Sequence, residues 1–441
     1  MRHHALTNAL AQSFLASDPS KRSLVLRGAE TLGRRWRWLA PLAGRYLKAF
    51  SSGLRPRHRE VVHFLSRDGG YLQALERHAD EIGIENWVRL SPRMRPAGAA
   101  EAWPIPAILT VADLADWLGV SPGELEWFAD LKALGYKKKT PSLRHYYYRI
   151  LQKSTGGIRL IEAPKGRLKE LQTRILSGIL DLIPPHEAAH GFTRGRSIRT
   201  YTAPHIGQHI VLRMDLTDFF PSYCGARVQT MFRTMGYPEH VADLLGGICT
   251  NSVPRDAWNN CPESIDRSSL WTAQILYSRP HLPQGAPTSP ALANFGAYRA
   301  DCRLAGLAGS TGAQYTRYAD DLAFSGDEHF ARSVKRFAAQ AGAILLEEGF
   351  TVNFRKTHMM RQGARQHLSG LVVNQRVNVN RPDFDLLKAI LTNCIRHGPE
   401  SQNRDAHPDF RAHLQGRIAF VEMINPEKGT RLRRIFEKIQ W

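Results

Sequence analysis

Two adjacent carboxylates in the tetrapeptide Tyr318-Ala-Asp-Asp321 constrain this chain more than any other feature of its sequence. Apolar, strand-like residues lead into the tetrapeptide from Ala313 to Tyr318 and out of it from Leu322 to Ser325. This pattern predicts a tight β-hairpin whose turn projects Asp320 and Asp321. An Asp-Asp pair alone is typical of a solvated turn, so a metal site here depends on acids elsewhere in the chain.

A third acid follows an apolar run that begins at His209 and reads as a buried strand, with Asp215 near its C-terminal end. The three carboxylates can therefore meet. Two negative charges about 4 Å apart repel by roughly 4 kcal/mol at an effective dielectric of 20, so cations are needed to fill such a cluster. Ligands that are all oxygen favour Mg²⁺ or Mn²⁺ over Zn²⁺. We therefore expect a pair of divalent ions of the kind that performs phosphoryl transfer.

Seven short segments of the chain stand in an order that is known from one protein family. They are Arg159–Lys165, His190–Ser197, Met214–Phe220, Leu282–Pro290, Tyr318–Asp321, Val352–Thr357 and Leu368–Asn374. In these segments, and from about Leu114 to the C-terminus, the chain resembles the reverse transcriptases, and among them the bacterial retron-type enzymes. The resemblance implies an RNA-directed DNA polymerase with an α+β, right-hand fold, made of fingers, a palm with an antiparallel sheet, and a helical thumb.

The resemblance also implies roles for individual residues. The ions, two Mg²⁺ with Mn²⁺ as the alternative, would be held by Asp215, Leu216, Asp320 and Asp321. Lys356 matches the family position that protonates or neutralises the departing pyrophosphate. The nucleotide-binding residues would be Arg159, Lys165, Phe220, Gln284 and Gly285. Primer and template would be contacted by Tyr318, Ser369, Gly370 and Arg417.

Arg159 and Lys165 fall on a β-hairpin that is predicted from Leu143–Ile150 and Ile158–Ile161, with its turn at Gly156-Gly157. In a polymerase this hairpin belongs to the fingers, and its cations reach the triphosphate. Without the family resemblance, the two side chains would be interpreted as solvated strand charges.

Phe220 bears on the choice of sugar. It lies five residues beyond Asp215 and is expected under the sugar of the incoming nucleotide. A bulky ring there offers no hydrogen-bonding partner to a 2′-hydroxyl and leaves little room for one, so deoxynucleotides should be preferred. The alternative is that Phe219 and Phe220 pack beneath the strand, an interpretation that fits one of them better than both.

The charge of the chain suits a polyanionic partner. Sixty Lys and Arg against forty Asp and Glu leave a net charge of +20, which attracts nucleic acid at long range. Residues 1–60 hold twelve basic and three acidic side chains, and residues 130–175 hold the same numbers. The expected partners are template RNA, the DNA product, dNTPs, a cognate non-coding RNA and an effector or toxin protein. A basic surface without a ligand is the alternative.

Three regions are expected: residues 1–105 as a basic helical extension and linker, 106–375 as interleaved fingers and palm, and 376–441 as the thumb with two helical patterns. In the extension, Trp36 and Trp38 stand among arginines. They would stack on RNA bases or, as we prefer, pack in a helical core. Residues 250–281 look like an insertion that contacts RNA.

The sequence favours a cytoplasmic protein with no membrane partner. No apolar run approaches the roughly 20 residues that span a bilayer, and no signal-peptide pattern follows Met1. The five cysteines are scattered and include no C-x-x-C pair, so neither disulfides nor a zinc site is indicated.

Two segments depart from the retron pattern. Retron enzymes carry Asn-Ala-x-x-His where this chain has Tyr201-Thr-Ala-Pro-His205, and Val-Thr-Gly where it has Leu368-Ser-Gly370. Both segments are tied in the family to the use of a dedicated structured RNA. The alternatives are another bacterial reverse transcriptase that makes no branched product, an RNA-synthesising polymerase, and an RNA-binding sensor with a vestigial polymerase site.

Overall fold

The computed structural model of the chain describes residues 2–51, 55–88, 92–138, 140–153, 157–259, 261–262 and 264–441. The chain forms two compact units, one of Met1–Leu182 with Gly225–Pro280 and one of Ile183–Cys224 with His281–Trp441. Each unit is therefore built from two separate stretches of sequence.

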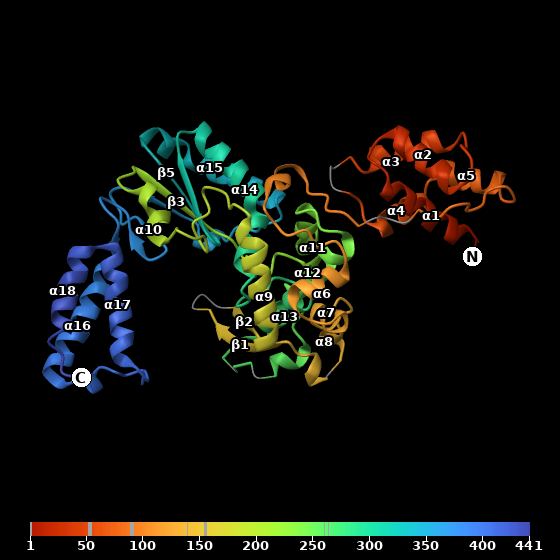
Figure 1. Cartoon of the computed structure of the whole chain (residues 1–441). Helices are drawn as coiled ribbons and strands as arrows, with labels where there is room; N and C mark the ends of the chain where they lie inside the picture. Colours follow the sequence, from red (N-terminus) through yellow and green to blue (C-terminus); the bar gives the residue numbers. More distant parts are fainter. Residues whose placement is uncertain are drawn as a thin grey trace. The chain divides into compact units, whose positions relative to one another are not determined.

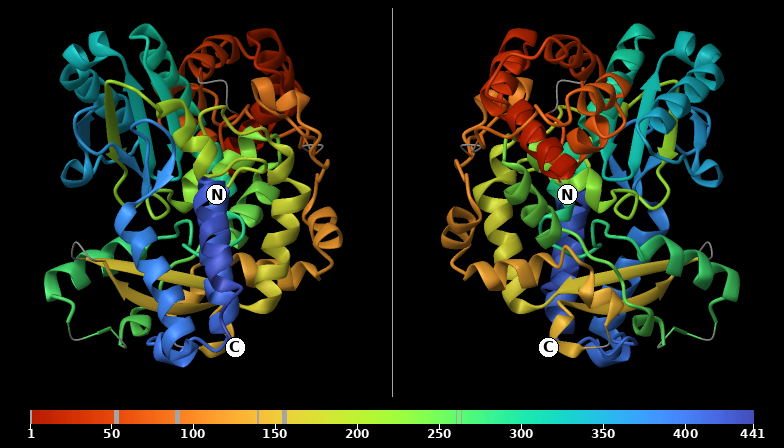
Figure 2. Two further views of the ribbon diagram at one scale, coloured as in Figure 1. Left: turned by 90° about the vertical axis from the view of Figure 1, so that its left-hand side faces the viewer. Right: turned by 90° about the vertical axis from the view of Figure 1, so that its right-hand side faces the viewer.

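The first unit begins with five helices that share a core. They are α1 (Arg2–Ala16), α2 (Lys21–Thr31), α3 (Leu39–Ala49), α4 (His58–Leu65) and α5 (Gly69–Arg77), and Figure 2 shows them as one red and orange cluster. Trp36 is 7% exposed in their core, and Trp38 packs against it. The packing interpretation of the two tryptophans is confirmed, and base stacking on Trp36 is wrong because the ring is buried.

The rest of the first unit is mostly helical. Its helices are α6 (Val111–Leu118), α7 (Pro122–Ala129), α8 (Leu134–Lys137), α9 (Gly166–Gly178), α11 (Gly225–Thr234), α12 (Glu239–Ile248) and α13 (Arg267–Tyr277), with short 3₁₀ turns at Gly98–Ala102, Pro141–Leu143, Leu180–Leu182 and Arg255–Trp258. The start of α7 illustrates local control by sequence. Ser121 accepts a hydrogen bond from the Glu124 N–H at 3.2 Å, and the Glu124 carboxylate accepts one from the Ser121 N–H at 2.8 Å, so the two residues form a capping box.

Strands β1 (Tyr146–Gln152) and β2 (Ile158–Pro164) pair antiparallel, with Tyr146 opposite Pro164. The predicted hairpin is confirmed, although Gly156 of its predicted turn lies outside the described residues. Within the expected insertion, α13 packs against β2, and Trp258 shares a core with Leu160. Contact of residues 250–281 with RNA stays a prediction, and Asn260 and Glu263 lie outside the described residues.

The second unit is organised around a four-stranded antiparallel sheet in the order β4 (Gln314–Tyr318), β5 (Asp321–Gly326), β3 (Ile210–Asp215), β6 (His358–Arg361). Helices α14 (Ser289–Ser310) and α15 (Glu328–Glu347) pack against this sheet, as Figure 1 shows. Buried residues of α15 recur at three- and four-residue spacing, as an amphipathic helix requires: Phe330, Val334, Phe337, Ala341 and Leu345. Before β3 lie α10 (Ile198–Thr202) and a 3₁₀ turn at Ala203–His205; another 3₁₀ turn at Phe354–Lys356 precedes β6.

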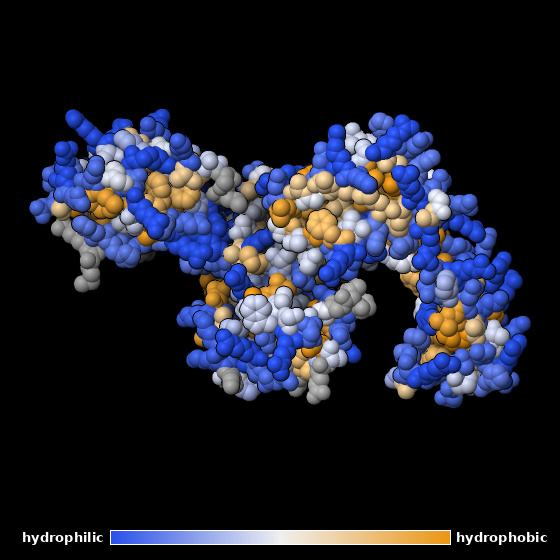
Figure 3. All heavy atoms as spheres, turned by 180° about the vertical axis from the view of Figure 1, so that it is seen from behind, coloured by the Kyte–Doolittle hydropathy of each residue, from blue (hydrophilic) through white to orange (hydrophobic). Residues whose placement is uncertain are grey.

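A small sheet and a helical bundle complete the second unit. The sheet joins β7 (His367–Leu368), β8 (Leu371–Val372) and β9 (Asn378–Val379), and the bundle contains α16 (Arg381–His397), α17 (Phe410–Ile424) and α18 (Pro426–Phe436), with a 3₁₀ turn at Pro399–Ser401. The sequence predicted α16 and α17 but not α18, which has only Leu432, Ile435 and Phe436 as large apolar residues. Figure 3 shows a hydrophobic patch within a hydrophilic surface on this bundle, whose exposed apolar side chains include Leu386, Ile395 and Phe420.

Helices and antiparallel strands together make this an α+β protein, as predicted. The five cysteines all lie in described residues, and no disulfide joins any of them. In the part of the chain that the structure describes, no helix combines the length and apolar character needed to cross a membrane.

Candidate active site

The acidic tetrapeptide forms the predicted hairpin between β4 and β5. Tyr318 pairs with Asp321 across a turn made by Ala319 and Asp320, and Ala319 has a left-handed φ of +55°, a value typical of the first turn position in a tight hairpin. On the next strand Asp215 pairs directly with Asp321, and the Leu216 N–H donates to the Asp320 carbonyl at 2.9 Å. The structure therefore brings the three acids to one end of the sheet.

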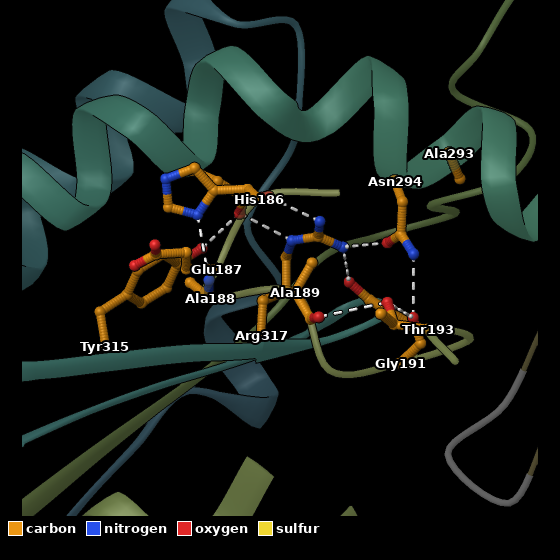
Figure 4. A network of polar contacts seen from close by, with 12 residues as sticks. His186, Glu187, Ala188, Ala189, Gly191, Thr193, Ala293, Asn294, Tyr315 and Arg317 are labelled. Atoms are coloured by element: carbon orange, nitrogen blue, oxygen red, sulfur yellow. Dashed lines mark hydrogen bonds and ion pairs between the residues drawn. The ribbon is translucent and has the colours of Figure 1, made fainter. Parts of the chain in front are cut away.

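A buried ion pair supports the backbone of this turn. The guanidinium of Arg317 donates to Asp301 at 2.8 and 2.6 Å, and its third nitrogen donates to the side chain of Asn294 and to the carbonyl of Ala319, both at 3.1 Å. Figure 4 shows Arg317 between Asn294 and the Ala189–Gly191 segment. The turn is thus held through its own carbonyl by a side chain of β4.

The segment before α10 packs directly against the same turn. The His190 N–H donates to the Arg317 carbonyl at 2.7 Å, and the Arg317 N–H donates to the Ala188 carbonyl at 2.7 Å. A Cβ at Gly191 would lie 2.6 Å from the backbone nitrogen of Ala319, so this position requires glycine. The family-like segment at His190–Ser197 therefore serves as a backbone support for the acidic hairpin.

Each of two acids at the sheet end has a cationic partner. Lys356 Nζ lies 3.1 and 3.2 Å from the two carboxylate oxygens of Asp215, and the Asn353 N–H donates to the Asp215 carbonyl at 2.7 Å. Arg213 donates to one oxygen of Asp321 at 3.0 and 2.6 Å. These contacts offset much of the charge that the acids concentrate there.

The pKa of Asp320 is raised by burial and by its position among the other acids. Burial, followed by the neighbouring charges of Asp321 and Asp215, raises the pKa of Asp320 to about 6. Both causes act in the same direction, because burial and neighbouring negative charge each disfavour the ionised carboxylate.

The donor set fits divalent ions, because three carboxylates and nearby backbone carbonyls offer the oxygen ligands that Mg²⁺ and Mn²⁺ prefer. Over the described ranges, no three His, Cys, Asp or Glu side chains already form a metal cage. In keeping with this, the carboxylates of Asp215 and Asp321 are directed at Lys356 and Arg213.

Phe219 and Phe220 differ in burial, as expected if only one of them packs beneath the strand. Phe219 is 5% exposed and packs with Tyr223 and Phe350, whereas Phe220 is only half-buried. The ring of Phe220 lies 6.2 Å from that of Phe192, which in turn lies 6.3 Å from the ring of Tyr318. Packing beneath the strand therefore accounts for Phe219 alone.

The other predicted nucleotide-binding residues lie in two different places. Gln284 is half-buried and Gly285 exposed in the loop before α14, where Gly285 has a φ of +132°. Arg159 is exposed on β2, and Lys165 follows β2 with its Nζ 5.5 Å from the ring centroid of Tyr147. Arg159 and Lys165 belong to the first unit, whereas Gln284, Gly285 and the three acids belong to the second.

The predicted primer and template residues all fall in the second unit. Tyr318 is half-buried beside Tyr201, with ring centroids 5.7 Å apart. Gly370 and Arg417 line one groove of about 410 Å³ between the β7–β8 turn, α16 and α17. Ser369 turns the other way, and its hydroxyl donates to Asp321 at 2.8 Å.

His205, the histidine kept from the retron pattern, lies beneath the hairpin. Its ring nitrogens are hydrogen-bonded to Ser325 on β5 at 2.6 Å and to Thr316 on β4 at 2.7 Å. Burial lowers the pKa of His205 to about 3, so the ring is neutral at pH 7. It joins the two hairpin strands, while its expected tie to a structured RNA stays a prediction.

Three residues of the site were not predicted from the sequence: Arg213, Phe192 and Arg317. Arg213 did carry a signal, because strand residues two apart share a face and Arg213 precedes Asp215 by two. Phe192 has a left-handed φ of +58° and is 56% exposed, neither of which its sequence context indicates. Arg317 resembles an ordinary solvated strand charge until its burial is known.

Comparison with known proteins shows the family to which the chain belongs. Residues 150–373 match the family model of reverse transcriptase (RNA-dependent DNA polymerase). The Retron Mx65 reverse transcriptase of Myxococcus xanthus is 41% identical over 334 residues, which cover 75% of this chain and 72% of that relative. The Retron Mx162 enzyme of the same organism is 35% identical over 72% of this chain and 64% of its own length. The Retron Ec86 reverse transcriptase of Escherichia coli is 30% identical over 68% of this chain and 83% of its own length.

The chain therefore belongs to the reverse transcriptases, which are RNA-directed DNA polymerases. Within that class its relatives place it among the retron-type enzymes. The class implies a right-hand polymerase fold and substrates that include an RNA template and dNTPs.

Proposed function

We propose that DNA synthesis takes place at the sheet end formed by Asp215, Asp320 and Asp321. The observation that carries this proposal is the direct pairing of Asp215 with Asp321, with Asp320 in the adjoining turn. Two Mg²⁺ ions, with Mn²⁺ as the alternative, would be held by these carboxylates and the Leu216 carbonyl. When bound, they would favour ionisation of the primer hydroxyl and neutralise charge on the leaving pyrophosphate.

The chain's own cations would complete the reaction. Lys356 Nζ, held against Asp215, is the group that would neutralise or protonate the departing pyrophosphate. Arg159 and Lys165 would bind the triphosphate, because its charge requires fixed cations during transfer. Gln284 and Gly285 would face the nucleotide from the loop before α14.

The primer and template would be contacted by residues of the second unit. Gly370 and Arg417 line the same groove, which supports a shared contact with the duplex, and Tyr318 stands next to the acids. In this assignment, residues 106–375 form fingers and palm, residues 376–441 form the thumb, and residues 1–105 form an accessory extension.

Phe220→Ala should relax the choice of sugar. Removing the ring opens space for a 2′-hydroxyl beneath the ribose. Because a small steric difference in a pocket changes discrimination by about 10–200-fold, the ratio of kcat/KM for dNTP to that for rNTP should fall by that factor. Competition between the two nucleotide classes in primer extension measures this ratio. Phe219→Ala is the matched control: it should destabilise the fold by about 3–5 kcal/mol and leave the ratio intact. An unchanged ratio in Phe220→Ala would remove Phe220 from the nucleotide site.

We further propose that the enzyme copies a cognate non-coding RNA into RNA-linked single-stranded DNA in the cytoplasm, as part of antiphage defence with an effector protein. The support is the similarity to three relatives that are retron reverse transcriptases. Nucleic acid recovered from the purified protein tests the product: DNA joined to RNA through a 2′ linkage is expected. Unlinked DNA alone would instead indicate a reverse transcriptase that makes no branched product.

A further inference from the structure

We infer that Ser369 is a positioning residue that fixes the carboxylate of Asp321 through its hydroxyl. The hydroxyl donates to Oδ2 of Asp321 at 2.8 Å, while Arg213 donates to Oδ1 at 3.0 and 2.6 Å. With both oxygens engaged from opposite partners, rotation of the carboxylate about its χ2 bond breaks at least one contact. The inference rests on the proposed function of Asp321 as a metal ligand.

The backbone conformation of Ser369 gives an independent reason for this role. Leu368 pairs with Leu371, so Ser369 and Gly370 make a two-residue turn, and their φ values are +44° and +86°. A hairpin turn with both central residues at positive φ favours Asn-Gly or Gly-Gly, because a Cβ is strained in that region. Serine is therefore a poor choice for the turn itself. Its hydroxyl, aimed at Asp321, explains why it stands there.

The two turn residues serve different surroundings. Ser369 is half-buried against the acidic site, whereas Gly370 is exposed and lines the groove shared with Arg417. A Cβ on Gly370 would meet no described atom within 4 Å, so positive φ rather than crowding accounts for that glycine. One peptide unit thus separates a contact with a catalytic carboxylate from a groove proposed for the duplex.

Two variants, Ser369→Gly and Ser369→Thr, distinguish the effect of the turn conformation from the effect of the hydroxyl group. Glycine suits the turn at least as well as serine and removes the hydroxyl, so Ser369→Gly should fold with an unchanged or higher melting temperature. Partners that orient metal ligands typically contribute 10–100-fold to metal affinity or activity. Ser369→Gly should therefore weaken Mn²⁺ binding, measured by electron paramagnetic resonance on the full chain without nucleotide, by about 10-fold or more, and should lower kcat with little change in KM for dNTP.

Ser369→Thr keeps the hydroxyl, as the threonine of the retron pattern does, and should restore Mn²⁺ affinity and kcat to near wild type even if the added methyl lowers the melting temperature. Wild-type Mn²⁺ affinity in Ser369→Gly, or equal loss in the glycine and threonine variants, would overturn the positioning role. Asp320→Asn separates this result from the proposed function. If Asp320→Asn binds Mn²⁺ as wild type does, the metal site itself fails; if only Ser369→Gly does, the metal site stands and the role of Ser369 fails.

Discussion

Asp320→Asn should abolish DNA synthesis while making the protein more stable. A bound metal ion contributes several kcal/mol of transition-state charge stabilisation, and each 1.36 kcal/mol is tenfold in rate. Loss of one carboxylate ligand should therefore reduce primer extension by about 10³-fold or more. Primer extension on an RNA template, with Mg²⁺ present, measures this loss.

The gain in stability follows from the raised pKa of Asp320. Burial and the charges of Asp321 and Asp215 place this pKa at about 6, above the value of about 3.9 for an unfolded aspartate. The protonated form is thus favoured in the fold, and the stability that it contributes is present below about pH 4 and is lost as the pH rises through 6. At pH 8 asparagine avoids the ionised carboxylate and should raise the free energy of unfolding by roughly 1–3 kcal/mol.

Thermal unfolding in EDTA at pH 8 and pH 5 checks this sign: the melting temperature of Asp320→Asn should exceed that of wild type at pH 8, and the difference should shrink at pH 5. Asp327→Asn is the matched control at the opposite end of β5. Asp327 caps α15 by accepting the Phe330 N–H at 3.0 Å, and asparagine caps helices equally well, so both stability and primer extension should stay near wild type. Wild-type extension by Asp320→Asn would refute the proposed site.

The parts of this site that could be predicted from sequence are those encoded in local patterns. The Tyr318–Asp321 hairpin follows from two strand-like runs around a short polar turn, and Asp215 follows from an apolar run that ends in an acid. Strand pairing then needs only a register to bring the acids together. The capping box that begins α7 was predictable for the same reason, since all its hydrogen bonds lie within four residues.

The parts that could not be predicted depend on burial and on distant partners. Lys356 reaches Asp215 across 141 residues. The family resemblance indicated a role for Lys356 at the departing pyrophosphate but not this ion pair. Ser369 reaches Asp321 across 48 residues, from a turn whose sequence gives no sign of strain. A hydrophobic pattern predicts where a helix or strand lies, but it does not predict which polar side chains contact one another in the folded protein.

Arg317 is the strongest case of a side chain whose role depends on burial, and removing its buried partner Asp301 should strongly destabilise the fold. The side chains of Arg317 and Asp301 are 2% and 1% exposed and are joined by two hydrogen bonds. Burial alone would lower the pKa of Arg317, but the charge of Asp301 and its hydrogen bonds raise that pKa above the ordinary value. Asp301→Ala leaves this guanidinium buried and unpaired, so it should lower the free energy of unfolding by about 3–5 kcal/mol.

The double variant Arg317→Met with Asp301→Leu separates the effect of the ion pair on stability from its effect on the position of the acidic turn. Replacing a buried pair by apolar residues of similar volume is often neutral or stabilising, so urea unfolding should show the double variant restored to within about 1–2 kcal/mol of wild type. The hydrogen bond from Arg317 to the Ala319 carbonyl is nevertheless lost. The turn that carries Asp320 is then no longer held by a side chain of β4. A hydrogen bond from a charged donor contributes about 1.5–3 kcal/mol, so kcat should fall by about 10–100-fold in a protein that is fully folded. A double variant with wild-type kcat would show that the buried pair stabilises the sheet without positioning the acids.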